Sequence, residues 1–180
     1  MRAVSKNGEP IPWYTYPAID FLCQRDFRDK IILEFGGGQS TLWWASRAKF
    51  VLSIEEDPDW FYRIRNQAPG NVELHNIAGD MDSIEKLIET RGMKFDVIII
   101  DGNLRGSLVG LSFRYLAPDG AVIIDNSDGY GFYEQTKNRA CRRIDFFGFA
   151  PGVILRHCTS IAFDNDCFLL ASDVPIPQIM

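Results

Sequence analysis

The stretch that decides the fold is IILEFGGGQST at residues 31–41. Its first residues are continuously apolar and rich in β-branched side chains, which is typical of a strand buried on both faces. Three glycines follow, and a helix is expected right after them, over Ser40–Ala48. Glycine allows the backbone to approach a ligand closely, and the free N–H groups at a helix start attract a carboxylate or a phosphate. The stretch therefore predicts a buried strand and a helix joined by a tight turn, which is either a bare turn or part of a ligand site.

Strand-like and helical segments continue to alternate outward from this stretch. Five strands are expected, at Lys30–Phe35, Phe50–Glu55, Asn71–Asn76, Phe95–Asp101 and Ala121–Asp125. The helices between them are expected over Ser40–Ala48, onward from the N-cap residue Asp57, over Met81–Thr90 and over Leu104–Leu116. Such alternation implies parallel strands with right-handed crossovers and helices on both faces of the sheet.

The two ends of the chain add further elements. A leading helix is expected over Tyr16–Phe27, and another helix over Phe132–Ala140. Three late runs have strand character, Arg142–Phe147, Thr159–Phe163 and Cys167–Leu170. Two of the three are expected to join the sheet, one of them antiparallel. The sequence thus predicts an α/β fold, a three-layer sandwich around a mostly parallel seven-stranded sheet with one antiparallel late strand.

The composition fits one soluble globular domain. The chain has 180 residues, of which 46% are hydrophobic and 24% charged, close to average values. Residues 1–29 would form an aromatic segment and the leading helix, residues 30–127 the cofactor-binding core, and residues 128–180 the C-terminal helix and late strands. The apolar runs are too short to span a bilayer and residues 1–12 lack a signal peptide, so a cytoplasmic protein without membrane contact is expected.

Net charge and cysteine content limit the kinds of binding partner that are expected. The net charge is −5, and the only clear basic cluster is Lys137, Arg139, Arg142 and Arg143, which a solvated helix end explains. No nucleic-acid partner is therefore expected. The four cysteines form no C-x-x-C pair, so reduced thiols are expected. The expected partner is a small-molecule substrate, and a homodimer is left open.

Acidic residues follow the expected strands. In an open α/β sheet, ligands bind outside the carboxyl ends of the strands. The acids expected at or near this edge are Glu34, Glu55, Asp80, Asp101 and Asp125. Glu55 lies about 19 positions after Gly36, close to the interval at which a neighbouring parallel strand ends. A carboxylate there can accept two hydrogen bonds from a ribose diol, although an exposed acid at a helix start is the alternative.

Two nucleotide motifs fit the glycine turn poorly. A phosphate-cradling loop needs a lysine, and none occurs in Gly36–Thr41. A dinucleotide fingerprint needs a small residue where Thr41 stands, and Glu34 is poorly suited to a place beside a pyrophosphate. An acid suits a cationic ligand better, such as an amine or a sulfonium.

Residues 32–41, ILEFGGGQST, resemble the E-x-G-x-G-x-S/T first motif of class I S-adenosylmethionine-dependent methyltransferases. Residues 53–55 are similar to the acidic end of that family's second strand. Residues 95–101 and 116–125 are similar to its fourth motif and its approach to the fifth strand, except that Asp119 replaces a glycine. The resemblance covers roughly Lys30 to Asn126 and implies a Rossmann-like fold with S-adenosylmethionine as cofactor.

The resemblance assigns roles to single residues. Glu34 and the backbone of Gly36–Gly38 would hold the methionine part, Glu55 the ribose, and Asp80 would lie near the adenine amino group. Asp101 would face both cofactor and substrate, and it is the candidate catalytic residue. The complete set of cofactor-binding candidates is Glu34, Gly36, Gly37, Gly38, Ser40, Thr41, Glu55, Asp80 and Asp101.

Asp101, Asp125 and Asn126 resemble the Mg²⁺ site of catechol-type O-methyltransferases. We instead expect Asp101 to act without a metal and residues 125–126 to begin a loop, so no metal is expected. The candidate substrate residues are Trp13, Tyr14, Tyr16 and Asn126. The dense aromatic segment 12–17 either covers the ligands or anchors the leading helix.

The sequence therefore favours methyl transfer from S-adenosylmethionine to an unidentified acceptor. The alternatives are an NAD(P)-dependent oxidoreductase and a non-catalytic nucleotide- or partner-binding domain of the same fold. Trp43 and Trp44 are expected in the core. His157, before Thr159, is either a general base or a plain loop residue, and the latter is expected.

Overall fold

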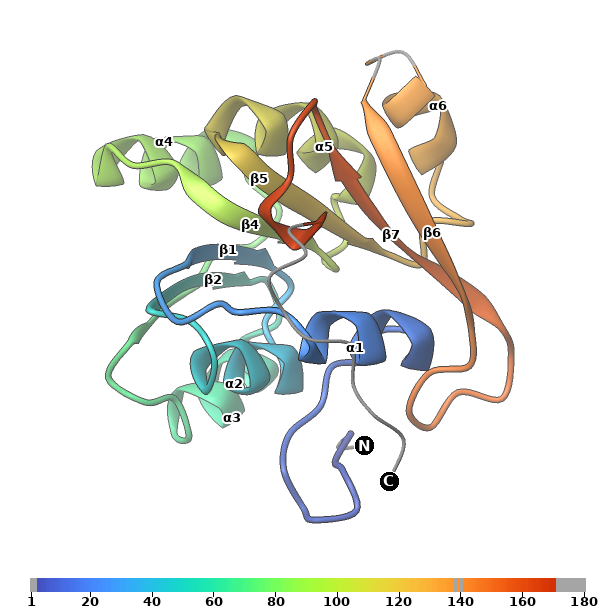
Figure 1. Ribbon diagram of the computed structural model, residues 1–180. Helices are drawn as coiled ribbons and strands as arrows, with labels where there is room; N and C mark the ends of the chain where they lie inside the picture. Colours follow the sequence, from blue (N-terminus) through green and yellow to red (C-terminus); the bar gives the residue numbers. More distant parts are fainter. Residues whose placement is uncertain (1–2, 138, 140, 171–180) are drawn as a thin grey trace.

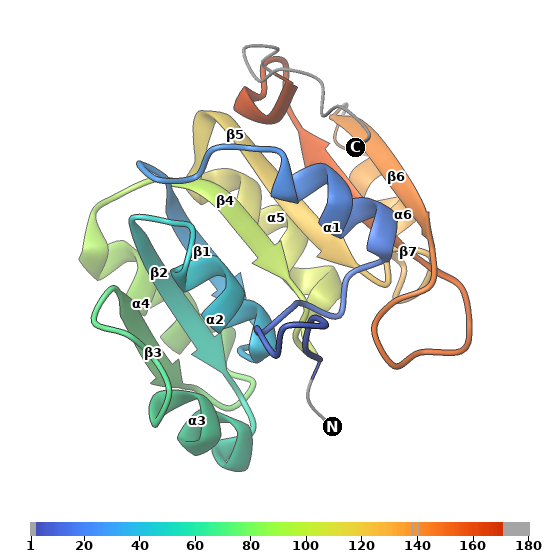
Figure 2. The same cartoon turned by 60° about the horizontal axis from the view of Figure 1, so that its bottom comes forward.

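The continuously apolar runs of the sequence form the inner strands of a seven-stranded sheet (Figure 1). The structure, a computed structural model, describes residues 3–137, 139 and 141–170. The strands are β1 Ile31–Phe35, β2 Phe50–Glu55, β3 Val72–Asn76, β4 Phe95–Ile100, β5 Leu116–Asp125, β6 Arg142–Gly148 and β7 His157–Phe163. Figure 2 shows them side by side in the order β3-β2-β1-β4-β5-β7-β6. The pairs among β1 to β5 are parallel, whereas β7 runs antiparallel to both β5 and β6.

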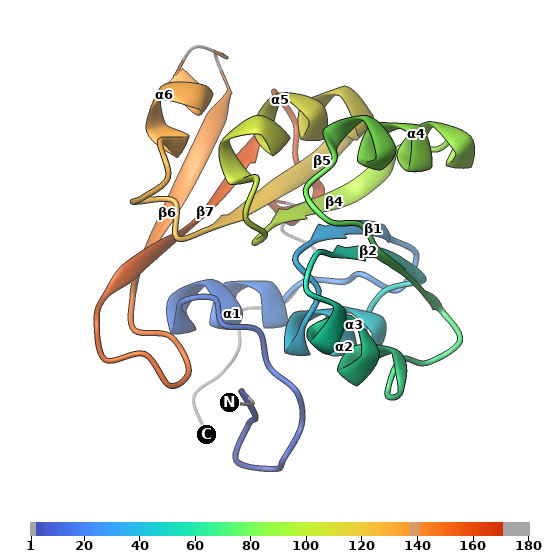
Figure 3. The same cartoon turned by 180° about the vertical axis from the view of Figure 1, so that it is seen from behind.

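Helices cover both faces of this sheet (Figures 1 and 3). They are α1 Tyr16–Cys23, α2 Gln39–Ala45, α3 Pro58–Arg65, α4 Met81–Arg91, α5 Arg105–Tyr115 and α6 Phe132–Lys137, with a 3-10 helix η1 at Phe168–Leu170. The helices α1, α2 and α3 lie on one face, and α4, α5 and α6 lie on the other. The predicted three-layer sandwich with one antiparallel late strand is therefore confirmed.

Alternate side chains of each inner strand supply the two cores. In β4, Val97 and Ile99 pack into the cluster with α1 and α2, whereas Ile98 and Ile100 pack into the cluster with α4 and α5. All four side chains are fully buried. Both faces of the strand are covered over residues 97–100, which is why this run is continuously apolar. Asp96, near the start of the strand, is only partly buried and accepts a hydrogen bond from the N–H group of Ile31.

The predicted start of the second crossover helix is confirmed at Asp57. The Asp57 carboxylate accepts hydrogen bonds from the backbone N–H groups of Asp59 (2.8 Å) and Trp60 (3.0 Å). Pro58 occupies the first helical turn, where its missing N–H group needs no partner. The cap fixes the point at which the chain leaves β2.

Several predicted boundaries were wrong. β5 begins at Leu116 and not at Ala121, because Leu116 pairs with Phe95 and the extra residues after it are absorbed in a register shift. Among the late runs, Cys167–Leu170 is not a strand, since Phe168–Leu170 forms η1. The leading helix ends at Cys23. The expected helix over Phe132–Ala140 ends at Lys137, and residues 138 and 140 lie outside the described residues.

None of the helices in the part of the chain that the structure describes is long and apolar enough to cross a bilayer. The four cysteines are unpaired, and Cys158 and Cys167 are buried.

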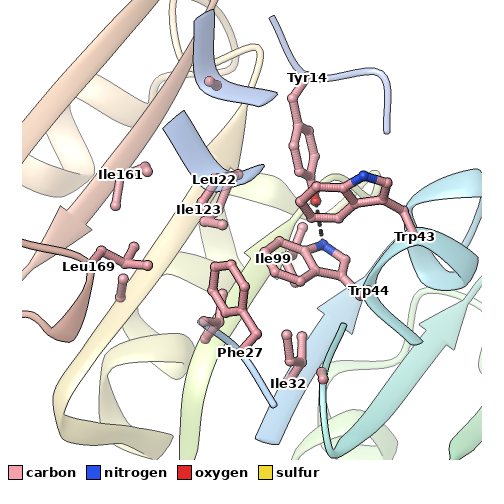
Figure 4. Close-up of a cluster of buried hydrophobic side chains, with 14 of the residues drawn as sticks. Tyr14, Leu22, Phe27, Ile32, Trp43, Trp44, Ile99, Ile123, Ile161 and Leu169 are labelled. Atoms are coloured by element: carbon pink, nitrogen blue, oxygen red, sulfur yellow. Dashed lines mark hydrogen bonds between the residues drawn. The ribbon is translucent and has the colours of Figure 1, made fainter. Parts of the chain in front are cut away.

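An aromatic group centred on Trp44 joins the N-terminal segment to α2 (Figure 4). The predicted core positions of Trp43 and Trp44 are confirmed. The Trp44 ring meets those of Phe27 and Trp43 edge-on, with centroids 5.0 and 4.6 Å apart. Its Nε1–H group donates a hydrogen bond of 3.1 Å to the hydroxyl of the fully buried Tyr14. This bond attaches residue 14 to helix α2.

Replacing Tyr14 by phenylalanine should destabilise the fold by about 1–3 kcal/mol, because the buried Trp44 N–H group would lose its acceptor. The free energy of unfolding is measured by urea titration with circular dichroism. The control is Tyr16→Phe, because the Tyr16 side chain is 47% exposed and its hydroxyl makes no hydrogen bond within the described residues. Equal stability of the two variants would contradict the proposed contribution of this bond.

Candidate functional site

A cavity of about 430 Å³ lies at the carboxyl ends of β1, β2, β4 and β5, with the start of β7 at its far side. This is the edge at which the sequence predicted ligands. The lining residues are Trp13, Gly36–Ser40, Glu55–Asp57, Trp60, Asp101–Asn103, Arg105, Asp125, Asn126, Val153 and His157. The structure therefore brings eight predicted site residues together: Trp13, Gly36, Gly37, Gly38, Ser40, Glu55, Asp101 and Asn126.

The glycine turn packs tightly against both neighbouring strands. Gly36 has φ +93°, and a Cβ atom there would lie 2.7 Å from the carbonyl carbon of Asp101. A Cβ atom on Gly37 would lie 2.9 Å from Oγ of Ser53. Gly38 is not confined in this way, because the nearest atom to its Cβ would be Oγ of Ser40 at 3.8 Å. Two of the three glycines are thus required by the fold, and the third faces open space in the cavity.

Glu34 lies beneath the turn and does not line the cavity. Its Oε2 accepts hydrogen bonds from Oγ1 of Thr41 (2.5 Å) and Oγ of Ser53 (2.7 Å). Thr41 Oγ1 in turn accepts one from the N–H group of Gly38 (2.9 Å). Oε1 of Glu34 is buried without a partner among the described residues. Burial raises the pKa of Glu34 to about 7, although its hydrogen bonds oppose the shift. Glu34 and Thr41 therefore brace the turn from below.

Glu55 ends β2 beside the glycine turn and borders the cavity. Its Oε1 accepts a hydrogen bond of 2.7 Å from the N–H group of Asp57, which holds the carboxylate in place. Only 8% of the residue is exposed, and burial raises the pKa of Glu55. The alternative of a freely exposed acid at a helix start is therefore wrong for Glu55.

Arg105 connects the acids at the ends of β4 and β5. It donates hydrogen bonds to Oδ1 of Asp101 (3.0 Å) and Oδ1 of Asn126 (2.7 Å) and to the backbone carbonyl of Asp125 (2.9 Å). Burial and the nearby Asp125 raise the pKa of Asp101 well above its usual range, although Arg105 opposes this. Burial also raises the pKa of Asp125.

The same guanidinium group occupies the position between the metal candidates Asp101 and Asn126, and it also bonds to the backbone of the third candidate, Asp125. It already bonds to one oxygen each of Asp101 and Asn126, which a metal ion would need as ligands. Within residues 3–137, 139 and 141–170, no three His, Cys, Asp or Glu side chains are grouped so that they could hold an ion. A cation is thus supplied at this point by the chain itself.

The aromatic candidates occupy three different environments. Trp13 lines the cavity, and its ring meets that of Trp60 edge-on with centroids 6.2 Å apart. Tyr14 lies in the core, so the expectation that it contacts substrate is corrected: its fully buried ring has no free surface. Tyr16 begins α1 outside the cavity lining, and its N–H group donates to the carbonyl of Phe149. Its expected substrate contact is not supported either.

Asp80 is likewise not brought to the cavity. Its exposed carboxylate caps α4, accepting hydrogen bonds from the N–H group of Asp82 (3.2 Å) and from Oγ of Ser83. These bonds lower the pKa of Asp80. In this structure the group acts as a helix cap, and its contact with an adenine stays a prediction.

Arg105, Trp60 and His157 are among the cavity residues that were not predicted as site residues. Arg105 could have been noticed, because it stands four positions after Asp101 at the start of a helix. Trp60 carries no sequence signal beyond its place after the Asp57 cap. His157 was expected in a loop, but it starts β7 and pairs with Gly148, so that expectation was wrong.

Comparison with known proteins identifies the class of fold. No protein-family model matches the sequence, and no curated protein sequence matches it. Solved structures do share the architecture. Precorrin 8W decarboxylase from Methanobacterium thermoautotrophicum has a TM-score of 0.58 at 15% identity, over 91% of this chain and 96% of that chain.

Two further solved structures are similar. The tRNA (m1A58) methyltransferase TrmI from Aquifex aeolicus has a TM-score of 0.59 at 14% identity, over 86% of this chain and 71% of that chain. SMU.1697c from Streptococcus mutans, solved in complex with S-adenosylhomocysteine (SAH), has a TM-score of 0.57 at 14% identity, over 81% and 95%. The chain thus has the fold of class I S-adenosylmethionine-dependent methyltransferases. The names of these proteins include a decarboxylase, so the fold alone does not decide the reaction.

Gly36→Ala should destabilise the protein far more than Gly79→Ala. Both glycines have positive φ, but a Cβ atom on Gly79 would meet nothing within 4 Å. The left-handed backbone costs a non-glycine residue about 1–2 kcal/mol, and a forced overlap adds about 1–3 kcal/mol. Urea titration of the two variants separates these contributions. Equal losses would show that the contact with Asp101 is not limiting.

Glu34→Gln should change the dependence of stability on pH. A folded pKa of about 7 against the ordinary 4.5 means that folding favours the protonated carboxyl. The associated stability is fully present below pH 4.5 and is lost as the pH rises through 7. Between these limits the wild type should lose up to roughly 3 kcal/mol relative to Glu34→Gln. Glu34 also helps to raise the pKa of Asp101, so the substitution changes the titration of Asp101 as well, to a smaller extent than it removes that of Glu34. Unfolding titrations of both proteins across this range measure it, and a constant difference would contradict the assignment.

Proposed function

We propose that the cavity binds S-adenosylmethionine and that the chain transfers its methyl group to a small-molecule acceptor. The observation that carries this proposal is the buried carboxylate of Glu55, which borders the same cavity as the Gly36–Gly38 turn. A carboxylate at the end of the second strand can accept a hydrogen bond from each of the two ribose hydroxyl groups. The fold shared with methyltransferases supports the proposal at the level of architecture.

The charges around the cavity favour a cation over a diphosphate. Five acidic residues line it: Glu55, Glu56, Asp57, Asp101 and Asp125. Among the residues that the structure describes, Arg105 is the only Lys or Arg in the lining, and Asp101 already pairs with it. A pyrophosphate bridge would lie among carboxylates without a free basic partner, whereas a sulfonium ion would be attracted. This arrangement favours methyl transfer over the NAD(P) alternative.

The size and the lining of the cavity also suit S-adenosylmethionine. A volume of about 430 Å³ lies within the range of small-molecule sites. Gly38 leaves room at the turn, and Trp13 with Trp60 offers aromatic surface to a cation at the wall. When bound, S-adenosylmethionine supplies a methyl group on positively charged sulfur. The protein's part is to hold, align and desolvate the two reactants.

Calorimetry with SAH and with NAD tests the proposal. SAH should bind and NAD should not. Glu55→Ala should weaken SAH binding by about 10- to 100-fold, because a hydrogen bond to a charged group contributes about 1.5–3 kcal/mol. Glu89→Ala is the matched control, since this exposed acid lies on α4 outside the cavity lining.

The proposal is wrong if NAD binds in preference to SAH. The ribose role of Glu55 is wrong if Glu55→Ala, folded by circular dichroism, binds SAH as tightly as Glu89→Ala does. Binding of SAH without transfer to any of a broad set of acceptors would instead favour a non-catalytic domain of this fold.

A further inference from the structure

A histidine with an unpartnered ring nitrogen borders the cavity at its β5–β7 side. His157 is the first residue of β7, and only 8% of it is exposed. Its Nε2 is buried and has no hydrogen-bond partner among the described residues. Leaving such a group unmatched costs about 1–3 kcal/mol, so the position calls for an explanation.

The acid beside this histidine is held rigidly. Oδ1 of Asp125 lies 3.8 Å from Nε2 of His157. The same oxygen accepts a hydrogen bond of 2.7 Å from Oγ1 of Thr159, and residues 125 and 159 are paired across β5 and β7. At 3.8 Å the two groups face each other without a hydrogen bond, and a carboxylate this close to Nε2 favours the tautomer that carries its proton there. In that tautomer the lone pair is on Nδ1, which can accept a proton.

The strand order separates this histidine from the proposed cofactor end. The glycine turn follows β1, whereas His157 starts β7, three places further along the sheet after β4 and β5. At about 4.8 Å per strand the two lie roughly 14 Å apart. The ribose candidate Glu55 lies beyond β1 on the opposite side. His157 is therefore placed on the acceptor side of the cavity.

The charges of the cavity and of the sulfonium ion limit the net charge that the methyl acceptor can carry. An anionic acceptor at this end would meet Asp101 and Asp125, and Arg105, the only guanidinium among the described residues that line the cavity, is already paired. A cationic acceptor would be repelled by the sulfonium ion with which it must react. A neutral compound avoids both repulsions, and Trp13 and Val153 give the cavity apolar wall.

We propose that His157, oriented by Asp125, removes the proton from a neutral hydroxyl acceptor bound at the β5–β7 side of the cavity. The inference rests on the proposed function. In the step, the O–H bond of the acceptor breaks and its proton moves to Nδ1 of His157. The oxygen bonds to the methyl carbon, and the carbon–sulfur bond breaks with its electron pair left on sulfur. The products are a methyl ether, SAH and an imidazolium ion that returns its proton to water.

The first test observes binding and needs no turnover. The chain has two histidines, His75 and His157, so protein labelled with ¹⁵N-histidine gives two sets of ring signals, which His157→Gln assigns. Phenol is added to the SAH complex as the probe. We expect the His157 ring nitrogens to shift and those of His75, in β3, to stay unchanged. A His157 signal that phenol does not move overturns the inference. Absence of SAH binding contradicts the proposed function instead.

The second test compares acceptors of similar size: phenol, benzyl alcohol, benzoate and benzylamine. Transfer is expected to the two hydroxyl compounds. His157→Gln should lower the rate with phenol by about 10²–10⁴-fold, the usual contribution of a general base. It should leave SAH affinity unchanged. Transfer to benzoate or benzylamine alone, or to none of the four, overturns the acceptor class.

Acceptors of different acidity distinguish a proton-accepting role of His157 from a merely structural one. With 4-nitrophenol, which loses its proton far more easily than phenol, His157→Gln should lose much less activity. His75→Gln, outside the cavity lining, should match the wild type with both compounds. An equal loss with both phenols in His157→Gln would overturn the proton-acceptor role.

Discussion

The backbone of Gly36 lies against the backbone of Asp101 with no room for a side chain between them. The turn is tied to both neighbours of β1, since the Gly36 N–H group donates to Ile54 (2.9 Å) and the Asp101 N–H group donates to Phe35 (2.8 Å). This close approach brings the end of β4 to the glycine turn. If the backbone segments at Gly36 and Asp101 were further apart, Asp101 and the glycine turn would not border one cavity. The glycines at positions 36 and 37 are thus a condition of packing before they are a condition of binding.

Sequence reasoning succeeded where a residue's environment follows from its neighbours in the chain. The apolar runs 31–33 in β1 and 97–100 in β4 and the Asp57 cap were identified because periodicity and capping are local properties. The start of β5 was misplaced because Leu116 pairs with Phe95 across an irregular register, which only the partner strand determines. A local reading could not foresee that pairing.

The candidate site shows the same limit. The glycine turn and Glu55 were predicted from spacing, and both line the cavity. Trp13 and Tyr14 are adjacent, yet one borders the cavity and the other lies in the core. Outside a helix or strand there is no regular repeat of buried positions, so the sequence cannot tell which of two neighbouring aromatic residues is buried. Arg105 was missed for a related reason, because its partners come from the ends of two different strands.

The reversed direction of β7 has a consequence for how such a site can diversify. Every parallel strand presents its last residue at the ligand edge, but β7 presents its first, directly after the connection from β6. That connection, residues 149–156, is tethered at residues 148 and 157 and has no part in the glycine turn. Its length and composition can therefore change without disturbing the opposite half of the cavity. One half of the molecule can stay constant while selection reshapes the other.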